Sequence, residues 1–250
     1  MRFAGKRVLV TGGARGIGAA TAAAFLREGA VVAIGARTQQ SFDAFAAEHR
    51  GARIMPALGE IGTQKQAATV VAQAVTAFGG LDVLVNSAGY FAEVKVEDVD
   101  QAHWNQTMDT NVAGTFFCSQ AALPALKASH GNIVNVASDA GIIGYPLGAV
   151  YSASKAAVVN MTRAMVLELA QQIRINCVCP GNVDTDMIRQ AAEATGDPAT
   201  YLKAAHERSP MKRMARPSEV ADAILYLAST DAGFVNGAIL SIDGGGVCGF

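Results

Sequence analysis

Short apolar runs that alternate with helix-like stretches constrain the fold of this chain more than any other feature. Seven runs are rich in Val, Ile and Leu, and they lie at residues 7–10, 31–34, 53–58, 81–85, 131–137, 173–179 and 238–242. Most of the segments between them carry apolar residues at helical spacing. Strands that alternate with helices are typical of βαβ units, so the pattern predicts a parallel sheet.

The composition is that of a protein with a large buried core. Of the 250 residues, 51% are hydrophobic and 16% are charged, and the formal net charge is -1. This length fits one large α/β domain or two small ones, and because no repeat or linker interrupts the chain, we expect a single domain over residues 1–250. The sequence carries no basic footprint for nucleic acid and no uninterrupted apolar stretch of membrane-spanning length. Its first residues lack the long apolar run of a signal peptide, so we expect neither a secretion signal nor a nucleic-acid or membrane partner.

The four cysteines show no secretory disulfide framework, which favours the reducing cytoplasm as the location of the protein. Cys177 and Cys179 stand two apart in a strand-like run, and we expect their side chains to point to opposite faces, a poor geometry for a metal pair. The histidines are scattered through polar surroundings. We therefore expect no metal site.

A glycine-rich turn follows the first apolar run and leads directly into an Ala-rich helical stretch. Its glycines are Gly12, Gly16 and Gly18, with the spacing G-x-x-x-G-x-G. Such glycines allow a tight turn and let backbone N–H groups approach a pyrophosphate at the start of a helix. The alternative is a tight turn that binds no ligand.

The end of the second predicted strand bears on the choice of nucleotide. A dinucleotide site usually has an acidic residue there to bind the ribose 2′-hydroxyl, but this chain has Gly35, Ala36 and Arg37. Arg37, together with Arg15 in the glycine-rich turn, could pair with a 2′-phosphate. This favours NADP(H), with NAD(H) still possible, unless Arg37 is only a solvated residue at a strand end.

Tyr151 and Lys155 form a candidate acid–base pair. Their spacing places both side chains on one face of a helix, one turn apart. A phenol keeps its proton to about pH 10, and a neighbouring ammonium lowers that pKa. Tyrosine and lysine at this spacing are also common on solvated helices, so the pair needs support from the rest of the chain.

That support comes from small and polar residues at other strand ends and in a long helical pattern. Residues 86–89 read Asn-Ser-Ala-Gly, Ser138 follows the fifth run, and Pro180 and Gly181 follow the sixth. Asn111 lies within the long helical pattern of residues 100–127, either as a buried hydrogen-bonding group or on a polar face. The carboxyl ends of parallel strands are where such sheets bind ligands.

Taken together, these pieces resemble the short-chain dehydrogenase/reductase family over essentially the whole chain. The matching residues are Thr11, Gly12, Gly16, Ile17, Gly18, residues 86–89, Asn111, Ser138, Tyr151, Lys155, Pro180, Gly181, Asn182, Val183, Thr185, residues 235–237 and residues 243–245. The resemblance implies a Rossmann-like, doubly wound α/β fold. It would have seven parallel strands in the order 3-2-1-4-5-6-7, with helices on both faces.

The resemblance also implies roles for four catalytic residues in hydride transfer between a nicotinamide and a carbonyl or secondary alcohol. Tyr151 would be the general acid and base, and Lys155 would lower its pKa and bind the nicotinamide ribose. Ser138 would hydrogen-bond the reacting oxygen, and Asn111 would hold a water that links Lys155 to solvent.

For the cofactor, the resemblance implies contacts along the carboxyl ends of the strands. The expected residues are Gly12, Arg15, Gly16, Ile17, Gly18, Arg37, Glu60, Ile61, Asn86, Ala88, Gly89, Tyr151, Lys155, Pro180, Gly181, Val183 and Thr185. Two positions depart from the commonest family pattern. Glu60 and Ile61 stand where Asp and Val are more frequent, and Ser87 replaces an Asn.

The polar segment at about residues 187–213 departs from the strand–helix rhythm, and we expect it to be a mobile lid over the substrate. The expected pocket lining is mostly apolar, from Tyr90, Phe91, Ile142, Ile143, Tyr145 and Met187. The substrate would be a small molecule. The helical patterns at residues 100–127 and 151–171 are expected to pair in a homotetramer or homodimer. A non-enzymatic dinucleotide sensor or scaffold on the same fold is the alternative function.

Overall fold

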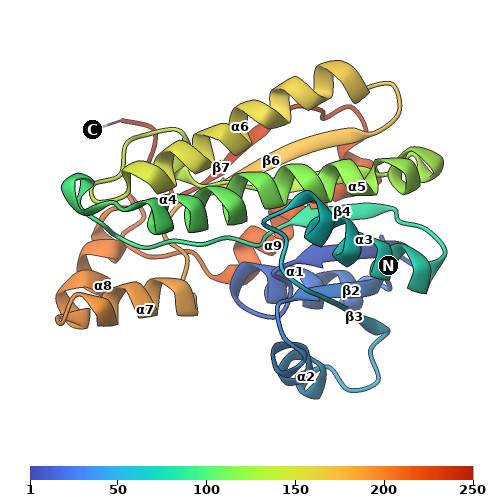
Figure 1. Cartoon of the computed structure of the whole chain (residues 1–250), viewed down its shortest axis with the longest axis horizontal. Helices are drawn as coiled ribbons and strands as arrows, with labels where there is room; N and C mark the ends of the chain where they lie inside the picture. The colour runs from blue at the N-terminus through green and yellow to red at the C-terminus, as the bar shows by residue number, and fades with distance from the viewer. Residues whose placement is uncertain (250) are drawn as a thin grey trace.

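The protein is built on a seven-stranded parallel sheet, and the computed structural model describes residues 1–249 (Figure 1). Phe250, the last residue of the predicted domain, lies outside the described residues. The strand order is β3-β2-β1-β4-β5-β6-β7, and every pairing is parallel, which confirms the predicted Rossmann-like fold. The strands are β1 Arg7–Thr11, β2 Val31–Ala36, β3 Ile54–Leu58, β4 Val83–Asn86, β5 Asn132–Val136, β6 Arg174–Pro180 and β7 Ile239–Ile242.

Helices cover both faces of this sheet. They are α1 Gly16–Arg27, α2 Gln39–Glu48, α3 Gln64–Phe78, α4 Gln101–Met108, α5 Gly114–Ser129, α6 Ala149–Leu169, α7 Asp186–Ala194, α8 Pro198–Glu207 and α9 Pro217–Ala228. Four short turns are η1 Val96–Asp98, η2 Asp109–Ala113, η3 Asp139–Gly141 and η4 Thr230–Ala232. None of the helices within residues 1–249 combines the length and the apolar character that a bilayer crossing requires.

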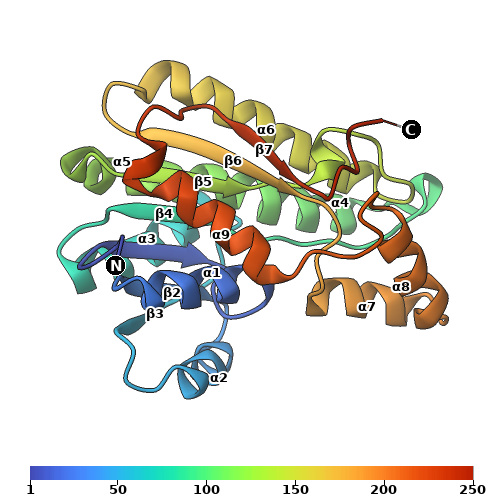
Figure 2. The same ribbon diagram turned by 180° about the vertical axis from the view of Figure 1, so that it is seen from behind.

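The two faces have separate cores because neighbouring residues of a strand point to opposite sides. Val8 and Val10 pack with α1 and α9 on one face, whereas Leu9 packs with α3, α5 and α6 on the other. Figure 2 shows α1 and α9 side by side on the first face, and Figure 1 shows α5 and α6 across the second. The central strands are buried on both sides, which explains their continuous apolar runs.

Two segments differ from the sequence-based expectation. The helical pattern at residues 100–127 is not one α-helix, because the π-helical turn η2 separates α4 from α5. The segment expected to be a mobile lid contains two helices, α7 and α8. The side chain of Asp197 accepts a hydrogen bond from the N–H of Thr200, and Pro198 occupies the first turn, so α8 has a regular helix start.

The expectation that Cys177 and Cys179 point to opposite faces is wrong. Both thiols are buried in one small core cluster with Val158 and Val159 of α6. Residues two apart in a strand share a face, and Val178 between them packs into the opposite core. Both cysteines are free, so α6 lies over a pair of buried thiols.

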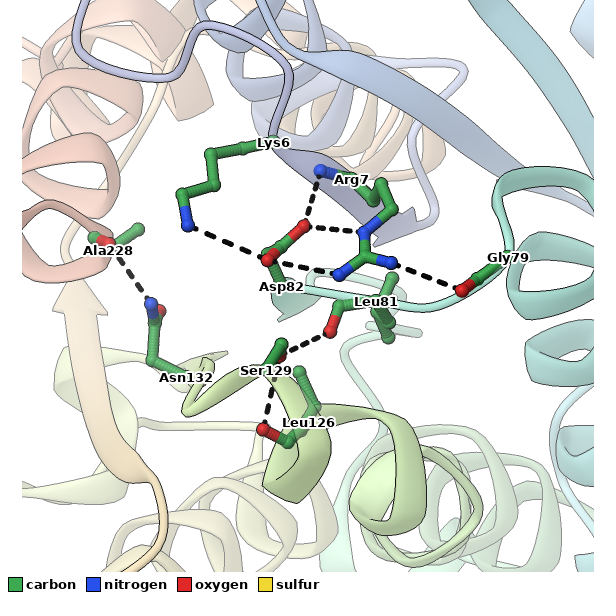
Figure 3. Close-up of polar contacts among 9 residues, drawn as sticks. All are labelled: Lys6, Arg7, Gly79, Leu81, Asp82, Leu126, Ser129, Asn132 and Ala228. Atoms are coloured by element: carbon green, nitrogen blue, oxygen red, sulfur yellow. Dashed lines mark hydrogen bonds and ion pairs between the residues drawn. The ribbon is translucent and has the colours of Figure 1, made fainter.

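A polar cluster joins β1 to the start of β4 at the amino end of the sheet (Figure 3). Asp82 accepts hydrogen bonds from the backbone N–H of Arg7 at 2.9 Å and from its Nε at 2.7 Å, and Lys6 Nζ lies 3.6 Å from the other carboxylate oxygen. Burial opposes ionisation of Asp82, but the hydrogen bonds from Arg7 outweigh it and hold the pKa of this carboxyl below its usual value. The pair fixes the relative position of two strands whose far ends carry the candidate site.

Replacing this carboxylate should destabilise the fold. We expect Asp82→Asn to lower the free energy of unfolding by about 2 kcal/mol at pH 7, because it removes the charge from a buried hydrogen-bonded pair. The matched control is Asp184→Asn at the exposed Arg189 pair, where the loss should stay below about 1 kcal/mol. Denaturant unfolding of the three proteins measures both differences.

The stability difference between wild type and Asp82→Asn should depend on pH. The pKa of Asp82 is lower in the folded than in the unfolded state, so its stabilisation is complete above the unfolded pKa of about 4 and is lost as the pH falls through the folded value. The gap between wild type and Asp82→Asn should therefore close in acid. Equal stabilities at pH 7 would contradict the role given to this pair.

Candidate active site

The glycine-rich turn is packed tightly against the loop after β4. Gly12 has φ +64°, and a Cβ at that position would lie 2.8 Å from the Cα of Ala88. A Cβ on Gly18 would collide with the carbonyl oxygen of Gly12. The side-chain oxygen of Thr11 accepts the backbone N–H groups of Ser87 at 3.1 Å and Ala88 at 3.2 Å, which ties the two loops together. The turn therefore requires glycine for steric reasons alone.

A cavity of about 570 Å³ opens above this turn, along the carboxyl ends of β1, β2, β3 and β4. Its wall includes Arg15, Arg37 and Ser41 at one side. The predicted cofactor residues that line it are Gly12, Arg15, Gly16, Ile17, Gly18, Arg37, Glu60, Ile61, Ala88, Gly89 and Thr185. Bare backbone beside the start of α1 and two guanidinium groups suit the phosphates of a dinucleotide, so the residues present fit an NAD(P)(H) molecule.

A smaller cavity of about 110 Å³ adjoins the first one. Ile17, Thr185 and Met187 line both, so the two cavities share a wall. Ser138 and Tyr151 line the smaller cavity, together with the predicted cofactor residues Pro180, Gly181 and Val183. Of the residues expected to form the substrate pocket, Phe91, Tyr145 and Met187 lie here, Tyr90 lines the larger cavity, and Ile142 and Ile143 line neither.

Tyr151 differs from the sequence-based expectation in the direction of its pKa. Burial raises the pKa of its phenol to about 12, and the nearby Ser138 hydroxyl opposes this shift without cancelling it. The edge of the Phe91 ring lies against Tyr151, with ring centroids 4.8 Å apart. The apolar surroundings therefore dominate, and Tyr151 is protonated at neutral pH.

Lys155 lies behind Tyr151 on α6 and lines neither cavity. Its Nζ is 5.7 Å from the centre of the Tyr151 ring and donates a hydrogen bond to the carbonyl of Val136 at 2.9 Å. Burial lowers the pKa of this amine to about 8. The amine is thus desolvated and is held by the end of β5, and burial rather than this amine sets the direction of the Tyr151 pKa.

Asn111 lies in the π-helical turn η2, with its side chain buried. Its amide donates to the carbonyl of Tyr90 and to Ser154 Oγ, both at 3.0 Å, and its Oδ1 accepts the Tyr90 N–H at 2.8 Å. A Cβ on Gly89 would lie 3.6 Å from both Asn111 Oδ1 and Lys155 Nζ. Asn111 and Lys155 are therefore brought together behind Gly89, and the π turn is a feature often found at functional sites.

Asn86, which was expected to contact the cofactor, turns into the core. Its amide donates to Ser119 Oγ and to Asn135 Oδ1, both at 2.9 Å, and the residue lines neither cavity. A polar residue at the end of a strand has the same appearance in the sequence whether it faces a cavity or a neighbouring helix. In this structure it links β4 to β5 and α5.

Comparison with known proteins identifies the family that this chain resembles. A family model described as enoyl-(acyl carrier protein) reductase matches residues 12–246. A cis-4-hydroxycyclohexanecarboxylate dehydrogenase of Sinomonas cyclohexanicum is 40% identical, with 97% of each chain covered. An L-fucose dehydrogenase of Mus musculus is 36% identical over 100% of this chain and 91% of its own, and an uncharacterized oxidoreductase of Thermotoga maritima is 38% identical over 98% of both.

The chain belongs to the short-chain dehydrogenase/reductase family. It is an NAD(P)(H)-dependent oxidoreductase that acts on CH–OH or C=O groups of a small molecule.

Several polar residues around the smaller cavity of this short-chain dehydrogenase/reductase were not predicted from the sequence. Asp139 accepts the Ser138 hydroxyl at 3.0 Å, and burial raises the pKa of its carboxyl against the opposing charge of Arg208. Glu93 and Tyr201 form a second polar group there. Asp139 could have been noticed because it follows Ser138 directly, but Arg208, Glu93 and Tyr201 carry no local signal.

The buried amine of Lys155 leads to a prediction about stability. Its pKa is about 8 in the folded protein and about 10.4 when unfolded, so folding disfavours the charged form. This penalty is complete below pH 8 and disappears as the pH rises towards the unfolded pKa. The free energy of unfolding of Lys155→Met minus that of wild type should therefore be larger at pH 7 than at pH 10, by on the order of 2 kcal/mol.

Denaturant unfolding at the two pH values measures this change, and titrations shared by both proteins cancel in the difference. Lys203→Met, which removes an exposed amine from α8, is the control and should show a pH-independent difference. A difference for Lys155→Met that does not change between pH 7 and pH 10 would mean that the buried amine carries no such penalty.

Proposed function

We propose that this enzyme is an NADP(H)-preferring oxidoreductase that interconverts a secondary alcohol and a carbonyl compound. One observation carries the proposal: the cavity of Ser138 and Tyr151 shares the side chains of Ile17 and Thr185 with the cavity above the glycine-rich turn. A nucleotide with its phosphates at that turn could extend its nicotinamide into the shared region. The named relatives are dehydrogenases, which supports an enzyme over the non-enzymatic sensor or scaffold.

The reaction moves a hydride and a proton. The cofactor would supply or accept the hydride at the substrate carbon, and the protein must handle the proton at the substrate oxygen. Tyr151 is protonated at neutral pH, so it can donate that proton when a carbonyl is reduced. Oxidation of an alcohol would require its phenolate, which forms once the phenol proton has passed to solvent, and the phenolate then takes up the proton of the alcohol. The Ser138 hydroxyl donates to Asp139 in this structure, and it would have to turn its proton towards the substrate oxygen to stabilise the charge that develops there.

Lys155 and Asn111 act from behind the cavity in this proposal. Within residues 1–249, Lys155 has the Val136 carbonyl as its one hydrogen-bond partner, so two of its ammonium protons are available to a ribose hydroxyl or a water. Asn111 holds the backbone of Tyr90 on both its N–H and its carbonyl, which keeps Gly89 beside the amine. We propose that the two residues relay protons between Tyr151 and solvent.

The preference for NADP(H) is proposed from the charges at the far side of the larger cavity. Arg15 and Arg37 both line it, and so does Ser41 in the first turn of α2. Glu60 is the acidic residue of this lining near the third strand, but the end of β2 carries no carboxylate. Two guanidinium groups favour a 2′-phosphate over a 2′-hydroxyl.

We also propose that the protein assembles as a homotetramer or homodimer. Large apolar side chains are exposed on the helices that cover one face of the sheet: Trp104 on α4, Phe116 on α5 and Leu167 on α6, the last at 88% exposure. Pairing of α5 and α6 with a second copy would remove this surface from water.

Removing the Tyr151 hydroxyl tests the proposed chemistry. Tyr151→Phe should lower kcat by at least about a hundredfold, the usual contribution of a positioned acid, while NADPH binds with unchanged affinity. Tyr226→Phe removes an exposed phenol on α9 and should leave kcat unchanged. Steady-state rates and fluorescence titration with NADPH separate the two effects, and a Tyr151→Phe enzyme that kept its turnover would refute the assignment.

Replacing one arginine tests the nucleotide preference. Arg37→Gln should raise KM for NADPH about tenfold, as expected for the loss of a charge-assisted hydrogen bond, and should leave KM for NADH within about twofold. Arg53→Gln, at an exposed position at the start of β3, provides the control. Equal changes in the two KM values would show that Arg37 does not contact a 2′-phosphate.

A further inference from the structure

The wall of the smaller cavity contains two tyrosine side chains that share one carboxylate. Tyr145 and Tyr201 both line the cavity. The hydroxyl of Tyr201 donates to Oε1 of Glu93 at 2.7 Å, and that of Tyr145 donates to the same oxygen at 3.3 Å. Glu93 is not part of the lining, so it lies behind the two phenols.

The number of protons decides what this wall can offer to a substrate. A phenol has one proton, and both protons here are donated to Glu93, so only the oxygen lone pairs of Tyr145 and Tyr201 remain for other partners. Burial also raises the pKa of Tyr145 and of Tyr201, so both stay protonated at neutral pH. The wall therefore presents hydrogen-bond acceptors and no phenol donor.

The charges around this wall also disfavour an anionic group on the substrate. Glu93 supplies one negative charge behind the phenols, and Asp139 supplies a second carboxyl within the cavity lining. Arg208, the cation in contact with this wall, lies 3.7 Å from Asp139 and 4.2 Å from the centre of the Tyr145 ring. An anionic group on a substrate would meet acceptors and carboxylates before it reached an unengaged cation.

The distance between the reacting phenol and this wall is set by aromatic packing. Phe91 lies edge-on to Tyr151 at 4.8 Å and edge-on to Tyr145 at 5.9 Å between ring centroids. One phenylalanine ring thus separates the proton donor from the acceptor wall. We therefore expect a compact molecule in this cavity of about 110 Å³ to contact Tyr151 and the wall together.

We propose that the substrate is a neutral alcohol or carbonyl compound with a further hydroxyl group, a polyol or cyclic sugar-like molecule, and that this hydroxyl donates to Tyr145 and Tyr201. Glu93 is the positioning residue, because it takes up both phenol protons and leaves the acceptor lone pairs facing the cavity. This inference rests on the proposed oxidoreductase function of the same site.

The test compares three ring alcohols with NADP⁺: cyclohexanol, the cyclohexanediols and a hydroxycyclohexanecarboxylate. We expect kcat/KM of the best diol to exceed that of cyclohexanol by about tenfold, as for one added hydrogen bond, and the carboxylate to be the poorest. Glu93→Met has no oxygen acceptor at this position, so it frees both phenol protons. It should lower the diol preference at least threefold and improve the carboxylate, with cyclohexanol within twofold.

Two further variants complete the design. Tyr201→Phe removes one acceptor and should also lower the diol preference, whereas Lys203→Gln, at an exposed position on α8, should leave it unchanged. If wild type preferred the carboxylate, the inference would be overturned, and Arg208 would be the residue that binds the substrate. Equal losses on all three alcohols in Glu93→Met would also overturn it, because they would show that Glu93 only holds α8 in place.

A binding measurement keeps the inference testable without turnover. In the presence of NADP⁺, the diol should raise the melting temperature of wild type more than cyclohexanol does, and Glu93→Met should remove the difference. Failure of this shift overturns the inference. A shift without any turnover of the alcohols or their ketones would instead count against the proposed reaction.

Discussion

The parallel pairing of β1, β4, β5 and β6 is the constraint on which the rest of the structure depends. The register places Thr11 beside Asn86 and Asn86 beside Asn135, so these strands end at one edge of the sheet. Each strand end then contributes a different part of the site, namely the glycine-rich turn, the loop to Gly89, Ser138 and the loop from Pro180. The cavities exist because parallel strands deliver their following loops to the same edge.

A chain of buried hydrogen bonds transmits this register to the helix that carries the acid–base group. Asn86 donates to Asn135 at 2.9 Å, and Asn135 donates to Thr162 of α6 at 2.9 Å. Lys155, two turns before Thr162, is held by the carbonyl of Val136. The helix is thereby fixed along its length against β5, and Tyr151 is held at the cavity beside Ser138. Buried polar links of this kind specify one arrangement where apolar packing would allow sliding.

Local patterns in the sequence predicted the parts of the fold that depend on local physics. The apolar runs gave all seven strands, and the four-residue spacing of Tyr151 and Lys155 placed both on one helix, α6. The direction of the Tyr151 pKa could not be predicted, because burial by distant segments outweighs a charge one helical turn away. The bond from Tyr201 to Glu93 spans 108 residues, and no spacing rule reaches that far.

The central claim is that Tyr151, a phenol protonated by burial, faces the bound nicotinamide. A positive charge on oxidised nicotinamide would favour the phenolate, so bound NADP⁺ should lower the pKa of Tyr151 from about 12. The direct measurement is the phenolate absorbance of wild type minus that of Tyr151→Phe between pH 6 and pH 10. The account predicts no difference signal without nucleotide and a clear titration with NADP⁺. A signal that is identical with and without NADP⁺ would contradict it.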